Sequence, residues 1–329
     1  MAEKEVNRFS DYVADPFSRW WDYIRGNVGR YYLSLLSIEF LNLFIKGLIL
    51  VFFGAIVFGL VLALGGLEAL VQQFGAFYTI IALLAALLVF GAVALLLISW
   101  VQQTLGLVIC AYTNAELTGK KFSIFEAANR LKGRALRLLL VESAIWFVLL
   151  LPITVFGAII MTLLFGLILL SVSSAFALTG ILVLLPVFMA TYLIGIIYII
   201  LVNLIYGFLA QFWRYGVAVE ELGVIAALKK SVSIVKARPF ETFTFDVLWI
   251  AGVTFFSTPA LIYAIIWRFG WEALNFTAVQ LDLVTMVEAY GVALVLNAVL
   301  SVILATITTT FSLPTLYFFW KKVKDSGPP

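Results

Sequence analysis

The chain has 329 residues, of which 64% are hydrophobic and only 12% are charged, and its mean hydropathy is +1.12. An ordinary globular chain carries about 25% charged residues, so this composition excludes an ordinary soluble protein. Histidine is absent, and Cys110 is the only cysteine. The sequence therefore lacks the commonest general base and metal ligand, and it has no second thiol for an intrachain disulfide.

A long segment without charge, residues 143–213, contains no Asp, Glu, Lys or Arg. About 20 apolar residues span the hydrocarbon core of a bilayer, so this segment is long enough for two crossings. A turn between them is predicted at residues 171–180. We interpret the chain as a multi-pass integral membrane protein of the all-α class, with room for six crossings but for no additional soluble domain of usual size.

Residues 1–30 predict a cytoplasmic amphipathic segment ahead of the first crossing. Asp15 is suited to be the N-cap of a helix, and Pro16 to be its first residue. Trp20 and Trp21 lie on the apolar side, and because tryptophan favours the headgroup level, we expect this helix to lie on the membrane surface. A helix that binds a partner protein is the alternative. No cleavable signal peptide is recognised here.

Six transmembrane helices are predicted from the apolar segments that follow. The third contains Pro152, which removes one backbone donor and should kink the helix. Ahead of it, Ser123 and Glu126 have capping-box spacing and predict the start of a short helix. Residues 223–237 predict a further amphipathic helix, stopped by Pro239. The predicted spans are 47–65, 76–101, 143–170, 178–210, 247–267 and 289–320.

Lysine and arginine fall almost entirely on one side of this map, since 19 of the 21 lie before the first span, in the second and fourth loops or in the C-terminal tail. The positive-inside rule then predicts a protein of the cell membrane with both termini in the cytoplasm. The two basic loops are candidate contacts for anionic headgroups, with a partner protein as the alternative and nucleic acid less favoured. Their basic residues are Lys120, Lys121, Arg130, Lys132, Arg134, Arg137, Lys229, Lys230, Lys236 and Arg238.

Three cytoplasmic segments share one design. Basic residues at 25–30, 132–137 and 236–239 follow an amphipathic segment and precede an outward–inward pair of helices. An acid then comes early in each odd-numbered span, at Glu39, Glu142 and Asp246. We interpret the chain as three pseudo-repeated hairpins plus cytoplasmic amphipathic helices. Duplicated helical units of this kind occur in many membrane proteins.

The sequence resembles the cytoplasmic signature of a broad prokaryotic group of six-span membrane proteins at residues 223–236, which read Gly-Val-Ile-Ala-Ala-Leu-Lys-Lys-Ser-Val-Ser-Ile-Val-Lys. Members of this group are mostly of unknown function and include the membrane domain fused to some glycerophosphodiester phosphodiesterases. Residues 314–322 also resemble theirs, and residues 122–134 do so more loosely. The resemblance implies six helices with cytoplasmic termini. It carries over no catalytic residue, because the phosphodiesterase domain has no counterpart in this sequence.

Four ionisable residues form a candidate polar site at the membrane edge: Glu39, Lys46, Glu142 and Asp246. A charge inside a bilayer costs a few kcal/mol, so a truly deep one indicates a function. If the first helix enters the membrane at its start, Lys46 is deep and should pair with one of the acids, in a buried ion network or a proton or substrate site. If the bilayer begins near residue 47, all four are merely the last charges before apolar segments. The second interpretation is favoured.

Polar residues also gather at the inner ends of the even-numbered spans. Hydrogen bonding between helices is the favoured explanation, and the lining of a pathway is the alternative. These residues are Gln102, Gln103, Asn114, Asn203, Gln211, Thr306 and Thr310.

Two functions of different classes fit these features. The first hypothesis is a transport-type or channel-like component for a small polar solute or a lipid. The alternative is a non-catalytic scaffold or accessory subunit that docks partners through its amphipathic helices, as a homo-oligomer or with a partner membrane protein. An enzyme is disfavoured, because histidine is missing and no nucleophile and base cluster. No catalytic residue, metal site or cofactor is predicted.

Overall fold

The computed structural model describes residues 2–63, 66, 71–72, 75–171, 177–278 and 283–326. The regular elements in these ranges are all helices, as predicted. They are α1 (Ala2–Ala63), α3 (Ala76–Leu117), α4 (Ile124–Ser171), α5 (Ala177–Ala210), α6 (Trp213–Ala218), α7 (Val224–Ala237), α8 (Pro239–Ala278) and α9 (Leu283–Asp325). The predicted turn at residues 171–180 overlaps the end of α4 at Ser171 and the first turn of α5 from Ala177, and its middle part lies outside the described residues.

Six of the described segments are long and apolar enough to cross a membrane. The chain is therefore a multi-pass membrane protein, and the predicted number of spans is confirmed. Most helices extend beyond the predicted spans, because helical hydrogen bonding continues outside the apolar segments. The candidate spans are Asp11–Leu62, Ile81–Leu117, Ile124–Thr162, Met189–Ala218, Pro239–Trp271 and Tyr290–Asp325.

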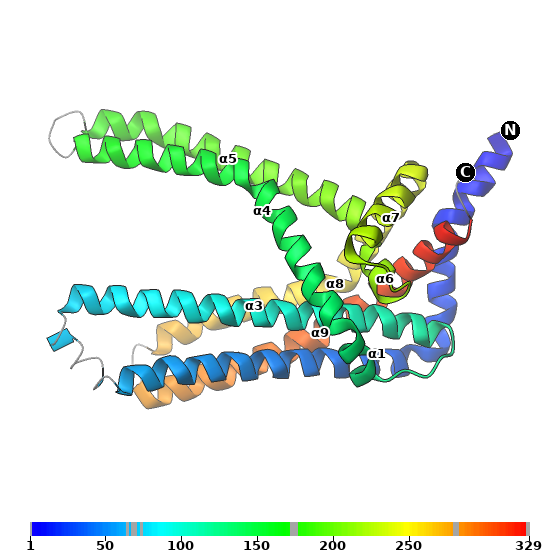
Figure 1. Cartoon of the computed structure of the whole chain (residues 1–329), viewed down its shortest axis with the longest axis horizontal. Coiled ribbons are helices and arrows are strands. Elements are labelled where there is room, and N and C mark those ends of the chain that lie inside the picture. The colour runs from blue at the N-terminus through cyan, green and yellow to red at the C-terminus, as the bar shows by residue number, and fades with distance from the viewer. Residues whose placement is uncertain are drawn as a thin grey trace.

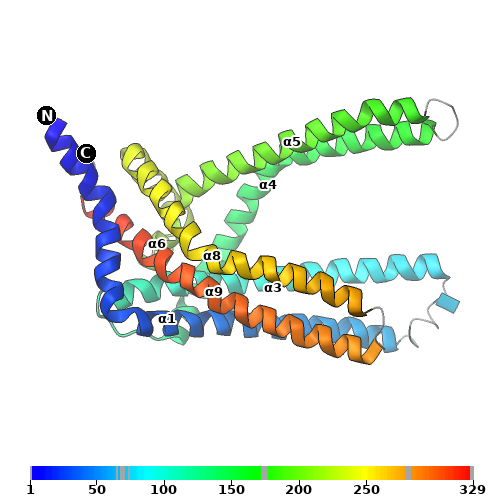
Figure 2. The same cartoon turned by 180° about the vertical axis from the view of Figure 1, so that it is seen from behind.

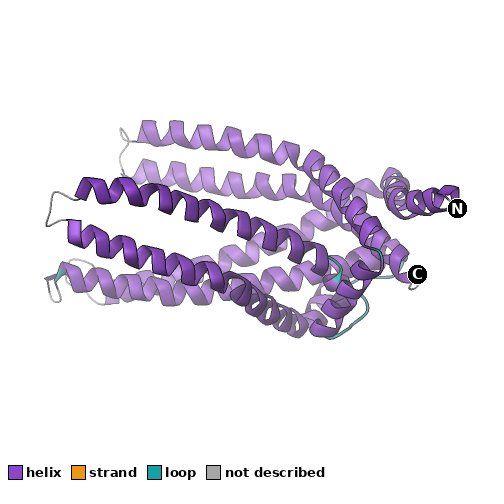
Figure 3. Ribbon diagram, turned by 90° about the horizontal axis from the view of Figure 1, so that it is seen from above, coloured by secondary structure: helices purple, strands orange, loops and turns teal. Residues whose placement is uncertain are grey.

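Consecutive long helices pack against each other in pairs: α1 with α3, α4 with α5, and α8 with α9. Contacts of α1 with α9 join the first and last pairs into a four-helix bundle, and the α4–α5 hairpin diverges from this bundle (Figures 1 and 2). Seen from above, the long helices run in the same general direction, with both termini at one end (Figure 3). This end also carries α6 and α7, and it is called the α6–α7 end below.

The best-buried side chains gather at the α6–α7 end, in a cluster called the aromatic hub. Its central contact is the stack of Phe245 from α8 on Phe319 from α9, with ring centroids 3.9 Å apart. The Tyr215 hydroxyl of α6 donates to the Leu313 carbonyl at 2.8 Å. By contrast, at most 6% of the residues in the most apolar window of each candidate span are buried inside the protein. The hub thus holds together helices that bury little of each other within the membrane. Its aromatic members are Phe212, Trp213, Tyr215, Phe245, Tyr317, Phe319 and Trp320.

Helix α1 begins well before Asp15, so the predicted helix start at Asp15 and Pro16 is wrong. Pro16 removes one backbone hydrogen bond, but tertiary contacts support the helix on both sides of it. The Trp20 indole donates to the Thr310 carbonyl at 3.2 Å, and Lys322 donates to the Asp15 carboxylate at 3.2 Å. The side chain of Asp15 is therefore used to join α1 to α9, and it does not cap a helix.

Helix α4 merges two elements that the sequence predicts as separate, the short helix after Ser123 and the third span. The intervening residues are rich in alanine, leucine and arginine, which favour a continuous helix. The capping contact is weak, because the Glu126 amide lies 3.5 Å from the Ser123 hydroxyl. Helix α4 bends along its length (Figures 1 and 2), and Pro152 lies within it. Helix α7 confirms the second amphipathic helix, which ends before Pro239.

We expect a side chain at Gly252 to disrupt the packing of α8 on α9. An ideal Cβ atom at this position would lie 2.3 Å from Cζ of Phe311. The Phe311 ring cannot easily move, because Trp20 and Phe256 pack against it with centroid distances of 5.0 and 4.8 Å. Overpacking of this kind costs about 1–3 kcal/mol. Gly252→Ala should therefore lower the midpoint of thermal unfolding of the detergent-solubilised protein.

Gly54→Ala is the matched control on α1, since a Cβ there meets nothing within 4 Å. This variant should unfold at the wild-type temperature or slightly above it, because alanine favours helix more than glycine does. Equal midpoints for Gly252→Ala and Gly54→Ala would contradict the close approach of α8 to Phe311.

Candidate functional site

Three of the four predicted ionisable residues have local hydrogen-bond partners. Asn42 donates to Glu39 at 3.3 Å within α1. Two neighbouring glutamines of α3 form hydrogen bonds to two different helices. Gln102 accepts from Lys46 of α1 at 3.3 Å, and Gln103 donates to Glu142 of α4. No ion pair joins Lys46 to any of the three acids in the part of the chain that the structure describes. The four residues therefore do not form one network.

Asp246 is the exception among the four. It lies on α8 directly after Phe245 of the hub, and only 9% of its surface is exposed. Its Oδ1 atom is buried without a hydrogen-bond partner, and so is Nε2 of Gln211. Gln211 follows the last residue of α5 and lies beside the Asp246 carboxyl. The Gln211 side chain lies within hydrogen-bonding reach of the Asp246 carboxyl, but Oδ1 of Asp246 and Nε2 of Gln211 make no hydrogen bond of normal geometry.

A cleft of about 570 Å³ opens at these two residues. One wall is α5 and the other is α8, and they make almost no backbone contact with each other. The α4–α5 hairpin, which carries the α5 wall, diverges from the bundle that contains α8 (Figure 1). Its polar members are Asn203, Gln211 and Asp246, and most of the rest of its lining is apolar: Leu204, Ile205, Phe208, Phe243, Val247, Trp249, Ile250 and Leu316. Glu39, Lys46 and Glu142 do not line it.

Other polar residues at the inner ends of the spans are engaged in helix packing. Asn114 of α3 accepts from the Tyr317 hydroxyl of α9 at 2.7 Å. Thr306 and Thr310 donate to backbone carbonyls one turn earlier in α9, each at 2.8 Å. Sequence reasoning named Asn203 and Gln211 but did not pair them with Asp246. The available signal was the matching order of a glutamine and an acid in the two halves, Gln103 before Glu142 and Gln211 before Asp246.

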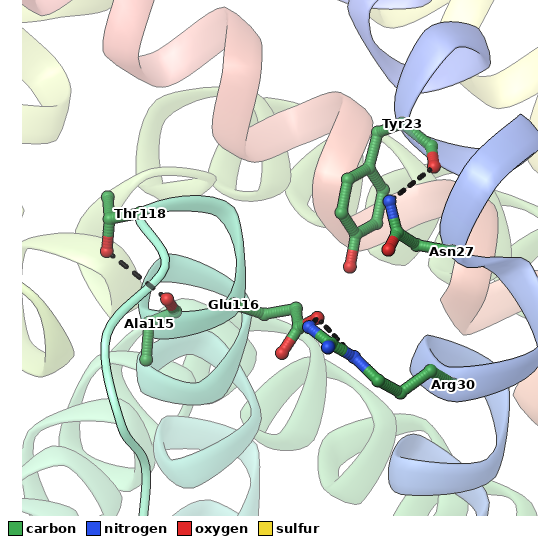
Figure 4. Close-up of polar contacts among 6 residues, drawn as sticks. All are labelled: Tyr23, Asn27, Arg30, Ala115, Glu116 and Thr118. Carbon is green, nitrogen blue, oxygen red and sulfur yellow. Dashed lines mark hydrogen bonds and ion pairs between the residues drawn. The ribbon is translucent and has the colours of Figure 1, made fainter.

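Ion pairs at the α6–α7 end join α1 to α3. Arg30 of α1 pairs with Glu116 at the end of α3 (Figure 4). One turn earlier in α1, the Asn27 amide donates to the Tyr23 carbonyl at 3.2 Å. Thr118 closes the end of α3 by donating to the Asn114 carbonyl at 2.7 Å. The Arg30–Glu116 ion pair therefore joins the first span to the second outside their apolar segments.

The loop between α6 and α7 is fixed by two neighbouring acids. Glu220 binds Lys230 of α7 and Lys324 of α9, each at 2.7 Å. Glu221 binds Arg130 at 2.9 Å and contacts Arg134 at 3.4 Å, both on α4. Glu221 has a φ of +59°, which a residue with a side chain rarely adopts. These contacts hold the loop in that conformation and tie three helices to it.

The predicted basic residues divide into two groups. Arg130, Arg134 and Lys230 are committed to the loop acids, and Arg238 lies over the Tyr12 ring at 4.4 Å and 4.0 Å from Glu241. The other six are exposed to the surroundings of the α6–α7 end: Lys120, Lys121, Lys132, Arg137, Lys229 and Lys236. Four of these ten basic residues are therefore structural, and the six exposed ones are accessible at the surface.

Within the described residues, no group of three Asp, Glu or Cys side chains lies close enough together to hold a metal ion.

The family model described as Domain of unknown function (DUF7847) matches residues 121–317, which include α4 to α8, most of α9 and the cleft. The chain matches no curated protein and no solved structure.

The Glu220 contacts predict a pH-dependent stability. Burial raises the pKa of Glu220, but hydrogen bonds from Lys230 and Lys324 outweigh it and hold the pKa below its usual 4.5. A carboxyl with a lowered folded-state pKa stabilises the fold above its unfolded pKa, and this stabilisation is lost as the pH falls through the folded pKa. Glu220→Gln should therefore unfold at a lower temperature than wild type at neutral pH, and the two should converge below pH 4.5.

Unfolding midpoints measured in detergent across this pH range check the prediction. Glu126→Gln is the control, because Glu126 is exposed, and it should follow the wild-type pH curve. A difference between Glu220→Gln and wild type that stays constant down to acid pH would contradict the contribution of the charged form.

Proposed function

We propose that this chain, which belongs to the family described as Domain of unknown function (DUF7847), is a transport-type membrane component that takes amphipathic, lipid-like molecules sideways from the bilayer into the cleft between α5 and α8. The single observation that carries the proposal is this cleft, which is apolar along most of its walls and polar at Asp246 and Gln211. The proposed activity needs no catalytic residue and no cofactor.

The pseudo-repeat explains why an opening lies at this seam. With three hairpins as equivalent units, the seams between units are α3–α4, α5–α8 and α9–α1. The first and the last are extensively packed, whereas α5 and α8 barely meet. The three units are thus joined at two seams, α3–α4 near the aromatic hub and α9–α1, and are open at the third. An opening in the side of such an arrangement gives access from the membrane interior, whereas an axial pore would give access from water.

The lining of the cleft favours a lipid over a small polar solute. Leu204, Phe208 and Ile250 offer apolar contact along the walls, and the polar groups are confined to a few positions. A volume of about 570 Å³ falls within the range of about 300–1,000 Å³ typical of small-molecule sites. A molecule with an apolar tail and a polar head matches both parts of this surface.

The positive-inside rule supports a cytoplasmic α6–α7 end in the cell membrane. The exposed lysines and arginines of that end would then lie at the level of anionic headgroups. The resemblance to the six-span prokaryotic group, carried by residues 223–236 and 314–322, is part of the same proposal. In this orientation the polar end of the cleft lies toward the cytoplasmic leaflet.

A scaffold function is the second candidate, and one observation favours it. Phe125 and Phe240 at the α6–α7 end are 79% and 80% exposed, and Ile225 of α7 is 60% exposed. Apolar side chains beside exposed lysines suit either insertion into a membrane surface or contact with another protein. A stable co-purifying partner, together with no effect on lipid movement, would favour this function over transport.

We expect Gly207→Phe to slow lipid movement by filling the cleft. Gly207 lines it, and a Cβ atom there meets nothing within 4 Å, so a side chain can enter the open space. The measurement is the exchange of tail-labelled fluorescent lipids between the leaflets of reconstituted vesicles. Wild-type protein should accelerate exchange over protein-free vesicles, and Gly207→Phe should reduce this acceleration several-fold.

Gly54→Phe is the matched control, because Gly54 lies on α1 outside the cleft and its Cβ also meets nothing within 4 Å. It should exchange lipids at the wild-type rate. No acceleration by the wild-type protein, or an equal loss in both variants, would refute transport through this cleft.

A further inference from the structure

Two glutamine–acid pairs occupy corresponding positions in the chain, but only one is complete. The glutamine precedes the acid by 39 residues for Gln103 and Glu142 and by 35 residues for Gln211 and Asp246. The difference of four residues is about one helical turn, so the same face can be kept. In the closed α3–α4 seam, Gln103 donates to Glu142. In the open α5–α8 seam, Gln211 Nε2 and Asp246 Oδ1 are left without partners.

An unpartnered buried carboxylate is costly. Removing an ion from water without a compensating partner costs several kcal/mol in a real protein. Native structures therefore satisfy nearly all buried polar groups, and an exception calls for a physical explanation. Asp246 is such an exception, since more than nine-tenths of its surface is covered. It also lines an open cleft.

The protein does not supply the missing cation. Among the described residues, no lysine or arginine forms an ion pair with Asp246, and its Oδ1 has no hydrogen-bond donor. Gln211 presents an amide beside the carboxyl. Asn203 also lines the cleft, about 12 Å farther along α5, and because its Nδ2 donates to the Ile199 carbonyl at 2.9 Å, its side-chain oxygen is left as an acceptor there.

We infer that Asp246, with Gln211, binds the protonated primary amine of a lipid headgroup while the acyl chain occupies the cleft between α5 and α8. An ammonium group carries three N–H donors and no acceptor, which matches a carboxylate and an amide oxygen. The inference rests on the proposed function, because the lipid has to enter through the open seam. It adds the chemical class of the headgroup.

The Gln211 side-chain amide can also donate a hydrogen bond to the lipid headgroup. Its Nε2 has no partner, and in a phosphoethanolamine headgroup a phosphate oxygen lies a few bonds from the amine. One amphiphile can then satisfy both the carboxylate and the amide. A trimethylammonium headgroup carries the same charge but no N–H donor, so it should bind more weakly.

The experiment measures binding of acyl-labelled phosphatidylethanolamine, phosphatidylcholine and phosphatidylglycerol to the full-length protein in detergent. We expect wild-type protein to prefer phosphatidylethanolamine over the other two lipids. Asp246→Asn keeps the shape of the side chain and should lower the affinity for phosphatidylethanolamine at least about tenfold, since hydrogen bonds to charged groups are the strong ones. Asp246→Glu should restore part of this affinity.

Glu142→Gln is the matched control, because Glu142 has the corresponding place in a closed seam and lies outside the cleft. It should bind all three lipids as wild type does. Equal affinity of the wild-type protein for the three lipids, or unchanged preference in Asp246→Asn, would overturn the inference. If Gly207→Phe still blocked binding in that case, the lipid-binding cleft would stand and only the headgroup assignment would fall.

Variants that fail to fold do not obscure the result. The preference among headgroups is measured on the wild-type protein alone, and it depends on no substitution. Loss of binding of all three lipids in Asp246→Asn, with an unchanged unfolding midpoint, would also count against the inference, because the carboxylate would then be needed for the cleft and not for the amine.

Discussion

The stack of Phe245 on Phe319 is the contact on which the arrangement of the helices depends. Burial of apolar surface is favourable where water is displaced, whereas inside a bilayer the lipid tails are as apolar as the helix surfaces. The buried cluster around this stack lies at the α6–α7 end, and it includes residues of α3, α4, α6, α7, α8 and α9. The spans are therefore held together mainly at one end, and they are free to splay toward the other.

The open seam follows from this distribution of packing. The α4–α5 hairpin is attached through α3 and α7 near the aromatic hub, and its remaining length stands apart from the bundle (Figures 1 and 2). Asp246 directly follows Phe245, so the contact that fixes α8 also fixes the position of the carboxyl in the lining of the cleft. The width of the cleft is thus set by the hub and by the loop that Glu220 and Glu221 tie to α4, α7 and α9.

Much of the fold could be predicted from the sequence, because membrane spans are set by long apolar segments. The start of α1 could not, since Asp15 carries a local start signal that tertiary contacts override. The start of α4 after Ser123 was predicted, but its continuation into the third span was not, because the intervening strong helix formers join the two elements. The open seam was also beyond prediction: Gln103–Glu142 and Gln211–Asp246 have the same sequence pattern, yet only the first makes its hydrogen bond. Lipid-facing and helix-facing leucines look alike, so the sequence does not tell which seam is closed.

The length of the uncharged segment of α8 can be compared with the thickness of a membrane. Residues 247–267 carry no charge, and they separate Asp246 from Arg268. At 1.5 Å per residue the two charges are about 33 Å apart along the helix, close to the thickness of about 30 Å of a hydrocarbon core. Lys46 and Glu68 have the same separation in the sequence. The spacing of Asp246 and Arg268 along α8 thus suits one charge near each face of a hydrocarbon core.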